Sequence, residues 1–223
     1  GEDYAQPGRL AACAKHFAGY GASESGRDYN TTDIPEIELR NVHLPPFRAA
    51  VEAGVASLMT SFSDLNGVPA SGNRFLMTQV LREEWGFDGF VVSDWDSIPQ
   101  LAVHGLTAGD RDSACEAANA GLDMEMASGT FAEHLEGLVH EGRVSLERID
   151  TMAANVLRAK IRLGLFERPY TDATLLPVPG NEGHLQEAHR AALQSAVLLK
   201  NNGGTLPLAA DRMASIAVIG LLT

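Results

Sequence analysis

Four short apolar segments, each followed by a helical segment, are the feature that most constrains how this chain can fold. They cover residues 11–17, 55–62, 89–93 and 121–126, and each consists mainly of small or β-branched residues and ends in polar ones. Runs of this length and composition are typical of strands buried in a parallel sheet. Because parallel strands need a crossover connection, the helical segments between them fit the same arrangement. The chain is therefore predicted to be an α/β protein.

The helical segments have recognisable starts and stops. They are predicted at residues 34–52, 73–85, 112–120, 130–141, 145–163 and 186–196. The first is interrupted by Pro45 and Pro46, and Ser145 is the expected N-cap of the fifth. On the fifth helix a single apolar stripe is expected to face the core. It consists of Leu146, Ile149, Ala153, Val156 and Leu157.

Four β-then-α units make about half of a (β/α)8 barrel of the TIM type, whose usual size is roughly 250 residues. An open half would leave two strand edges and one face of its inner core uncovered. We therefore expect residues 1–165 to be a half-barrel within a longer protein. The chain starts with Gly1 rather than Met, which is compatible with this expectation.

The character of the sequence changes after the predicted half-barrel. Residues 166–181 contain three prolines and are predicted to be a linker. Residues 182–223 contain one helical segment and then an apolar run at 215–219 that is predicted to be a strand. This last part is expected to be the incomplete start of a second domain, an α/β sandwich.

Charge and cysteine content exclude several classes of partner. The chain has 17 basic and 29 acidic residues, a net charge of -12, which repels phosphate backbones and anionic lipid. No apolar run approaches the roughly 20 residues that span a bilayer. Cys13 and Cys115 are the only cysteines, too few for a thiolate metal site. Neither nucleic acid nor a membrane is expected as a partner, and no metal is expected.

The third predicted strand delivers a carboxylate and an aromatic ring to the end of a barrel strand, where active sites of such barrels lie. These residues are Asp94 and Trp95. An ionised carboxylate beside an indole face is the arrangement that a sugar-cleaving nucleophile needs. The alternative is that Asp94 caps the following turn and Trp95 packs, and local sequence alone favours that alternative because Asp is a frequent cap.

Two further strand ends carry candidate residues. Lys15 and His16 emerge together from the first, and Met59 and Phe62 stand at the second. Lys15 and His16 could bind sugar hydroxyls or a carboxylate, Lys15 could form a Schiff base, and His16 could be a satisfied core residue. Met and Phe at a strand end are more often core than ligand contacts. Local sequence leaves these alternatives open.

Taken together, these segments resemble glycoside hydrolase family 3, in particular its bacterial periplasmic β-glucosidase branch. The resemblance runs from about residue 10 to residue 170 and continues more weakly to the end. It rests on the order and spacing of the segments KHFAGYG (15–21), GRDYN (26–30), LPPF (44–47), MTSF (59–62), LNGVP (65–69) and GFDGFVVSDW (86–95).

The resemblance implies a retaining β-glucosidase in which Asp94 is the nucleophile that forms a covalent glycosyl-enzyme. It implies that Lys15 and His16 hydrogen-bond the sugar, while Met59 and Phe62 line its subsite and Trp95 lies beside it. Asp96 is then a turn residue. The family also implies no cofactor, a periplasmic or secreted location, and that this chain is the C-terminal half of the barrel.

A retaining mechanism needs a second carboxyl about 5 to 5.5 Å from the first. In the β-glucosidase branch this acid/base is a glutamate of the domain after the barrel, which implies that it lies outside this chain. In the N-acetylglucosaminidase branch it comes from a histidine-containing loop, but residues 18–30 contain no histidine. Glu24 and Asp28 of this loop are expected to be structural. The family's first half-barrel supplies an aspartate and an arginine to the sugar, and these also lie outside the chain.

Two other hypotheses remain at this level. The chain could be a catalytically incomplete fragment, or one part of a split enzyme, that neither binds nor cleaves sugar alone. It could instead be a Schiff-base lyase that uses Lys15. The expected partners of the glucosidase are a β-glucoside or oligosaccharide substrate, the missing half-barrel and the second domain.

Overall fold

The structure is a computed structural model that describes residue 4 and residues 9–220. It divides into two compact units, Gly1–Tyr170 and Thr171–Thr223. Strands and helices alternate along the first unit, so the prediction of an α/β protein is confirmed.

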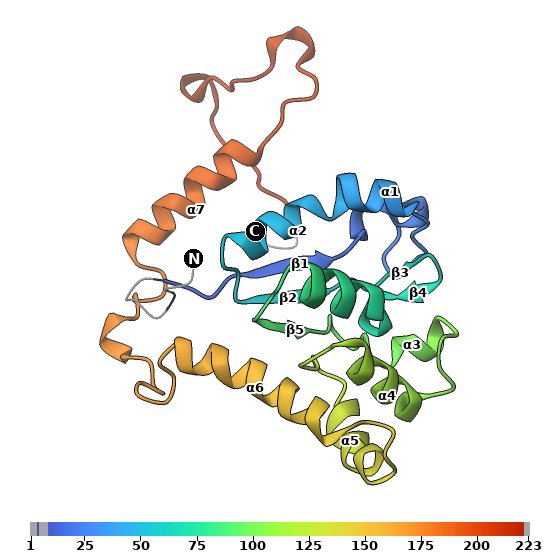
Figure 1. The fold of residues 1–223 in the computed structure, drawn as a ribbon. Helices are drawn as coiled ribbons and strands as arrows, with labels where there is room; N and C mark the ends of the chain where they lie inside the picture. The colour runs from blue at the N-terminus through green and yellow to red at the C-terminus, as the bar shows by residue number, and fades with distance from the viewer. Residues whose placement is uncertain (1–3, 5–8, 221–223) are drawn as a thin grey trace. The chain divides into compact units, whose positions relative to one another are not determined.

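A three-stranded parallel sheet organises the first unit (Figure 1). Its strands are β1 (Cys13–Phe17), β2 (Ser57–Thr60) and β5 (Phe90–Val92), in the spatial order β1-β2-β5. Neighbours in the sheet are therefore also neighbours along the chain, as in a barrel wall. The three predicted strands at residues 11–17, 55–62 and 89–93 are confirmed, with shorter bounds.

The fourth predicted strand, residues 121–126, is reduced to a single parallel bridge between Val92 and Met124. The prediction of a full strand is wrong, and the side chain of Asp123 supplies the reason. Its Oδ2 accepts the Val91 N–H at 2.9 Å, so a carboxylate takes the place of a backbone acceptor in the ladder. The remaining backbone bonds are those from Asp123 N and Met124 N to Val91 O and from Ser93 N to Met124 O.

β1 forms an open edge of the sheet within the described residues. It pairs with β2 on one side, and its register shifts between Ala14 and Phe17. Cys13 and Lys15 are exposed, and Leu10, just before the strand, is 90% exposed. The first predicted strand is thus buried only near Phe17, whereas β2 is buried along almost its whole length. A strand with neighbours on both sides would not expose such residues.

The helices and the remaining short elements complete the first unit. A hairpin of β3 (Asp64–Leu65) and β4 (Val68–Pro69) follows β2. The α-helices are α1 (Glu36–Glu38), α2 (Pro45–Glu52), α3 (Gln100–Val103), α4 (Asp110–Ala120), α5 (Thr130–His140) and α6 (Leu146–Arg162). Two π-helices, η3 (Leu39–His43) and η5 (Phe75–Glu84), and three 3₁₀ turns, η1 (Tyr20–Ala22), η2 (Glu24–Gly26) and η4 (Ala70–Gly72), lie between them.

The predicted helices are confirmed in place, with differences in detail. The helical segment at 34–52 is interrupted where predicted: η3 ends at His43 and Pro45 begins α2, because a proline at the first helical position loses no hydrogen bond. The segment at 73–85 is a π-helix, η5. Ser145 caps α6 as predicted, its Oγ accepting the Arg148 N–H at 3.1 Å.

The apolar stripe predicted on α6 faces the core only in part, through Ile149, which packs against the core. Leu146 is 63% exposed and Leu157 is 44% exposed. The buried positions are Met152, Asn155 and Ala159 instead. The helix therefore turns a partly polar face inward, because Asn155 donates to the buried carboxylate of Asp123 at 3.1 Å.

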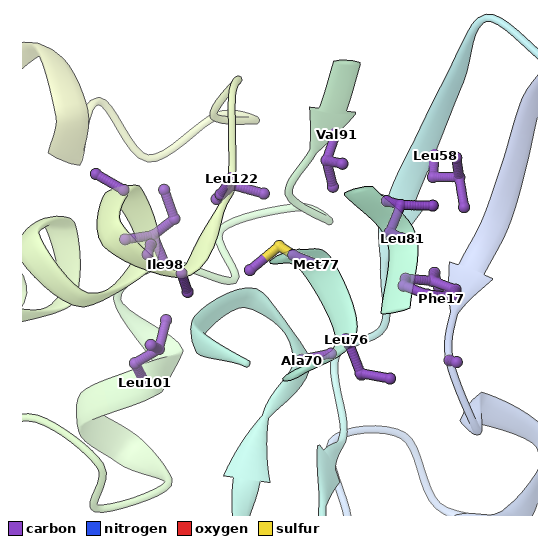
Figure 2. Packing of buried hydrophobic residues seen from close by; sticks show 14 of the residues in the cluster. Phe17, Leu58, Ala70, Leu76, Met77, Leu81, Val91, Ile98, Leu101 and Leu122 are labelled. Carbon is purple, nitrogen blue, oxygen red and sulfur yellow. The ribbon is translucent and has the colours of Figure 1, made fainter. Parts of the chain in front are cut away.

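The hydrophobic core lies between the sheet and its helices (Figure 2). Leu58 and Val91 of adjacent strands pack with Leu81 of η5, and all three are fully buried. Gly89 permits the close approach at the start of β5, since a Cβ there would lie 2.3 Å from the Ala56 carbonyl oxygen. This contact holds β5 against the segment that leads into β2.

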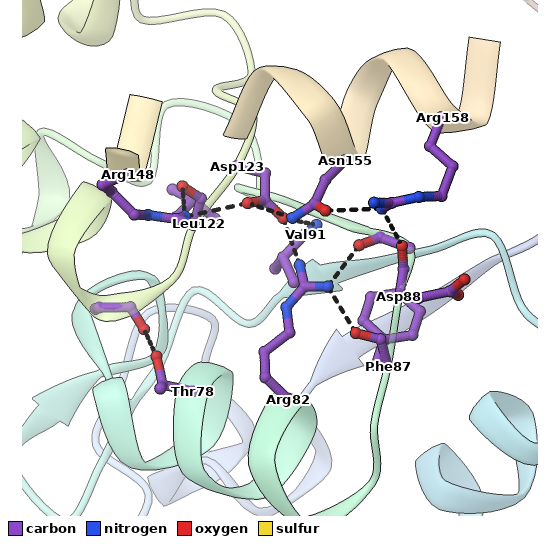
Figure 3. Close-up of polar contacts among 12 residues, drawn as sticks. Thr78, Arg82, Phe87, Asp88, Val91, Leu122, Asp123, Arg148, Asn155 and Arg158 are labelled. Carbon is purple, nitrogen blue, oxygen red and sulfur yellow. Dashed lines mark hydrogen bonds and ion pairs between the residues drawn. The ribbon is translucent and has the colours of Figure 1, made fainter. Parts of the chain in front are cut away.

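A buried ionic network holds the amino end of β5 to α6 (Figure 3). Asp123 is its centre and pairs with Arg82 and Arg148. Arg82 also donates to the carbonyl oxygens of Phe87 and Gly89, at 2.8 and 2.7 Å. Burial lowers the pKa of Arg82, and the Asp123 charge opposes this effect. The network lies at the end of β5 away from Asp94.

The second unit contains α7 (Glu182–Ser195), capped by the Asn181 side chain, which accepts the His184 N–H at 3.1 Å. Its other elements are the 3₁₀ turns η6 (Ala173–Leu175), η7 (Asn202–Gly204) and η8 (Ala210–Arg212). The strand predicted at residues 215–219 is absent from the structure, so that prediction is wrong. No other described strand belongs to this unit, so the segment has nothing to pair with there. Among the described residues of the chain, no helix is long and apolar enough to cross a membrane.

Candidate active site

The carboxyl ends of the parallel strands bring most of the predicted site residues to one edge of the sheet. β1 carries Lys15 and His16, β2 carries Met59 and leads to Phe62, and β5 leads to Asp94. Met59 is in register with Val92, two residues before Asp94. A parallel sheet aligns these ends, so residues far apart in sequence meet at the same edge.

Asp94 is 7% exposed, and its two carboxylate oxygens have different surroundings. Oδ1 accepts the backbone N–H of Trp95 at 2.7 Å, which fixes the direction of the group. Oδ2 lies 3.3 Å from His16 Nε2, yet it is buried and has no hydrogen-bond partner among the described residues. Buried carboxylate oxygens without a partner are costly and occur where a ligand or reaction uses them. The capping alternative explains one oxygen of Asp94 and leaves the other without a role.

His16 lies within ion-pair distance of Oδ2, and its environment favours the neutral imidazole. Burial and then the positive charge of Lys15 lower the pKa of His16, while the carboxylates of Asp94 and Asp28 oppose this effect. A neutral ring at neutral pH keeps a donor or acceptor beside the nucleophile candidate without adding a full charge. The His16 ring also packs on Tyr20, with ring centroids 4.5 Å apart.

The loop after β1 is tied together by its own side chains. The Tyr20 hydroxyl donates to Asp28 Oδ1, which raises the pKa of Tyr20 to about 12. This bond gives Asp28 a contact that holds the loop, in line with the structural role expected for it. Glu24 is exposed, and its backbone N–H donates to the Thr31 carbonyl oxygen at 2.9 Å.

The second strand end contributes an aromatic pair. Phe62 is half-buried, and its ring centroid lies 4.1 Å from that of Tyr29 in the loop after β1. Met59 is half-buried. Tyr29 was missed by the sequence reasoning, although it stands in the segment GRDYN, because nothing in that segment indicates that its ring returns to β2.

Trp95 and Lys15 are the most open of the predicted residues. Trp95 is 64% exposed beside Asp94, so a broad indole surface is available to a ligand. Lys15 is exposed on β1, and its charge acts on His16. Asp96 lies in the following turn, as predicted, with a positive φ of 56° and its N–H donating to Met126 O at 3.0 Å.

A chain of buried hydroxyls supports the loop that carries Asp94. Thr60 at the end of β2 bonds Ser71, and Ser71 bonds Ser97, both oxygen pairs at 2.8 Å. The Ser97 N–H donates to the Asp94 carbonyl oxygen at 3.2 Å. Three elements are thereby coupled behind the carboxylate. Single serines and threonines in three distant segments gave no sequence signal for this chain of contacts.

The arrangement is a directed carboxylate at a strand end with a neutral imidazole beside it and exposed aromatic rings nearby. No group of three or more His, Cys, Asp or Glu side chains in the described part of the chain is placed to hold a metal ion. Carboxylate chemistry next to aromatic surfaces is the pattern of enzymes that cleave glycosidic bonds. Fold and site together define the class as a glycoside hydrolase.

Residues 4–159 match the model of the glycosyl hydrolase family 3 N-terminal domain, and the chain belongs to this family. It is 41% identical over 214 residues to a periplasmic β-glucosidase of Salmonella typhimurium, covering 93% of this chain and 28% of that protein. It is 36% identical to a β-xylosidase of Formosa agariphila, covering 99% of this chain and 32% of the relative.

A solved structure agrees with these relatives. The β-glucosidase of Listeria innocua in complex with glucose superposes with a TM-score of 0.80 at 37% identity, covering 93% of this chain and 29% of that one. The chain therefore spans less than a third of the length of these relatives. Membership in a glycosyl hydrolase family argues against the Schiff-base alternative for Lys15.

Proposed function

We propose that this chain is the nucleophile-bearing part of a retaining β-glucosidase that removes terminal, non-reducing β-D-glucosyl residues. The observation that carries the proposal is the buried Oδ2 of Asp94, which lacks a hydrogen-bond partner among the described residues while Oδ1 is fixed by a backbone N–H. An oxygen in this state is directed, poorly solvated and free to attack an anomeric carbon.

The other predicted residues have supporting roles in this proposal. Lys15 and His16 hydrogen-bond hydroxyls of the sugar, Met59 and Phe62 line its subsite, and Trp95 stacks on its apolar C–H face. The acid/base that protonates the leaving group is a glutamate outside this chain. Two relatives support a glucosyl substrate, since one is named a periplasmic β-glucosidase and one solved β-glucosidase holds glucose.

The architecture proposed for the whole protein follows from the open surfaces of this chain. Residues 1–165 form the C-terminal half of a (β/α)8 barrel, residues 166–181 a linker, and residues 182–223 the start of a second α/β domain. Two surfaces support a partner for the half-barrel, namely the β1 edge and the exposed apolar face of α6 with Leu146 and Leu157. The relatives are more than three times as long, so the same polypeptide can supply that partner.

The second candidate is a catalytically incomplete module that acts only when the remaining segments are present. This candidate applies to the isolated chain, because the chain matches less than a third of each relative and more than two thirds lies outside the match. A periplasmic or secreted location is proposed from the name of the Salmonella relative alone.

Trapping with a 2-deoxy-2-fluoro β-glucoside that carries a good leaving group tests the proposal. The fluorine destabilises the cationic transition state, so a glycosyl-enzyme accumulates and the labelled peptide can be mapped by mass spectrometry. The experiment uses this chain and the longer natural protein, each as wild type, Asp94→Asn and Asp96→Asn. We expect label on Asp94, its loss in Asp94→Asn and its retention in Asp96→Asn.

Three results separate the alternatives. Label on the longer protein alone identifies this chain as the incomplete module. Label on both shows that the isolated half-site reacts. A folded longer protein that cleaves β-glucosides but is labelled at a residue other than Asp94 contradicts the nucleophile assignment.

A further inference from the structure

Tyr29 differs from the other tyrosine of its loop in what its hydroxyl does. The Tyr20 hydroxyl is committed to Asp28. The Tyr29 hydroxyl makes no hydrogen bond within the described residues, although its ring is held 4.1 Å from Phe62. A phenol with a fixed ring and an unused donor is suited to bind a polar ligand.

The backbone at Tyr29 is held in an uncommon conformation. Its φ is 62°, in the left-handed region that residues with a side chain rarely adopt. Such conformations persist only where the surroundings over-determine them, and they cluster at ligand-binding sites. The left-handed backbone at Tyr29 sets the direction of the tyrosine side chain.

Hydrogen bonds on both sides of Tyr29 hold its backbone in this conformation. Before it, Asp28 accepts from Tyr20. After it, the Asn30 amide donates to Glu24 O at 3.0 Å, and Thr31 Oγ1 donates to Asp64 Oδ2 at 2.9 Å. The loop is therefore fixed to itself and to the start of β3, and Tyr29 contacts the aromatic ring of Phe62 just after β2.

The charge of the nucleophile candidate acts on Tyr29. Burial, followed by the negative charges of Asp94, Asp28 and Asp96, raises the pKa of Tyr29. The phenol therefore stays protonated and able to donate across the physiological pH range. At 40% exposure, its surface is accessible to a substrate that enters beside Asp94.

We propose that Tyr29 is a substrate-binding residue whose hydroxyl donates to a hydroxyl of the glucosyl unit, while its ring and Phe62 form one aromatic wall. This proposal rests on the proposed β-glucosidase function and deepens it by adding a specificity-determining residue. A hydroxyl-to-hydroxyl bond in a partly dry site distinguishes sugars by which ring position carries the hydroxyl.

The test uses the longer natural protein and 4-nitrophenyl β-D-glucoside, together with its 3-, 4- and 6-deoxy analogues. Tyr29→Phe removes only the hydroxyl, and Tyr29→Ala also removes the aromatic wall. Tyr170→Phe is the matched control, because Tyr170 is 90% exposed. Labelling of Asp94 by the fluoro-glucoside is measured in every variant.

We expect Tyr29→Phe to lower kcat/KM for the parent glucoside about tenfold, the usual worth of one neutral hydrogen bond at its upper range. For one deoxy analogue the wild type and Tyr29→Phe should react equally, because the partner hydroxyl is already missing. Tyr29→Ala should lose more than Tyr29→Phe, and Tyr170→Phe should match the wild type.

A change under twofold in Tyr29→Phe, or an equal loss with the parent and all three analogues, overturns the role of Tyr29. Because Asp94 labelling is followed in parallel, such a result with wild-type labelling intact leaves the proposed function standing. Absence of labelling and of glucoside cleavage in the wild-type longer protein counts against the proposed function itself, and the Tyr29 role falls with it.

Discussion

Asp94 and His16 form an ionisable pair at the strand ends, and the protonation of His16 links this pair to stability. The pKa of His16 is lowered by burial and by Lys15. The unfolded chain therefore binds a proton at this residue more readily than the folded chain, and stability falls as the pH drops below the ordinary histidine pKa of about 6.5.

We expect the free energy of unfolding of the wild type to fall more than that of His16→Asn between about pH 7.5 and about pH 5.5. Urea unfolding followed by circular dichroism at both pH values measures the difference. His16→Asn removes the imidazole and keeps every carboxylate of the chain, so the difference between the two proteins follows the loss of His16. A wild type that loses no more stability than the variant would contradict the lowered pKa.

Ser97 ends the hydroxyl chain that supports the Asp94 loop. Replacing Ser97 by Ala removes its bond with Ser71 and is expected to cost about 1 kcal/mol of stability. The rate of Asp94 labelling in the longer protein should also fall, because the loop loses a fixed support. Ser195→Ala is the control, since Ser195 is exposed on α7 and bonds only its own helix. An unchanged labelling rate in Ser97→Ala would mean that the chain stabilises the fold without orienting the nucleophile.

At the scale of elements, the Asp123 network joins η5, β5 and α6 through one carboxylate. Arg82, Arg148 and Asn155 all bond it, and it also accepts a strand N–H. Removing the carboxylate leaves two largely buried guanidinium groups without their counter-charge, which is far costlier than losing an exposed pair.

Asp123→Ala is expected to lose about 3 kcal/mol of unfolding free energy, whereas Glu52→Ala should change it by less than about 0.5 kcal/mol. Glu52 pairs with Arg48, and both side chains are 64% exposed. Equilibrium denaturation of the two variants under the same conditions provides the measurement. Equal losses would show that the network contributes no more than a surface ion pair.

The elements also show what periodicity can and cannot predict. The start of α6 at Ser145 followed from a local cap, and the structure confirms it. The local sequence did not predict which face of α6 points inward. That face is set by the hydrogen bond from Asn155 to Asp123, a residue that precedes the helix by more than twenty positions. In the same way the fourth strand was overpredicted, since its apolar composition does not reveal that the Asp123 side chain replaces a ladder acceptor.

The candidate site shows the same division between local and long-range information. Asp94, His16 and Phe62 became candidates because each stands where an apolar run turns polar, and the parallel sheet aligns those positions. Their expected roles came from the family resemblance, since the local pattern left the alternatives open. Tyr29 and the hydroxyls of Ser71 and Ser97 were not identified, because their contacts depend on how loops return to the strand ends.

At the scale of the whole molecule, the unpaired side of β1 is the clearest sign of what adjoins this chain. The backbone groups on that side have no strand partner within the described residues. If a preceding half-barrel completes the sheet, those groups become paired and shielded from solvent.

Hydrogen exchange compared between this chain and the longer natural protein tests that expectation. Amides of residues 10–15 should exchange quickly in this chain and become protected by at least about tenfold in the longer protein. Those of β2, already paired on both sides, should change little and serve as the internal control. Equal exchange of residues 10–15 in both proteins would show that nothing pairs with this edge.

The two tryptophans of the chain lie in contrasting surroundings, and this difference has an optical consequence. Trp85 packs edge-on against Phe17, with ring centroids 6.0 Å apart, so its emission follows the integrity of the core. Trp95, largely open to water beside Asp94, emits from a polar environment that an arriving sugar would displace. With Trp85→Phe and Trp95→Phe to separate the two signals, intrinsic fluorescence can report occupancy of the strand ends and melting of the fold independently in one sample.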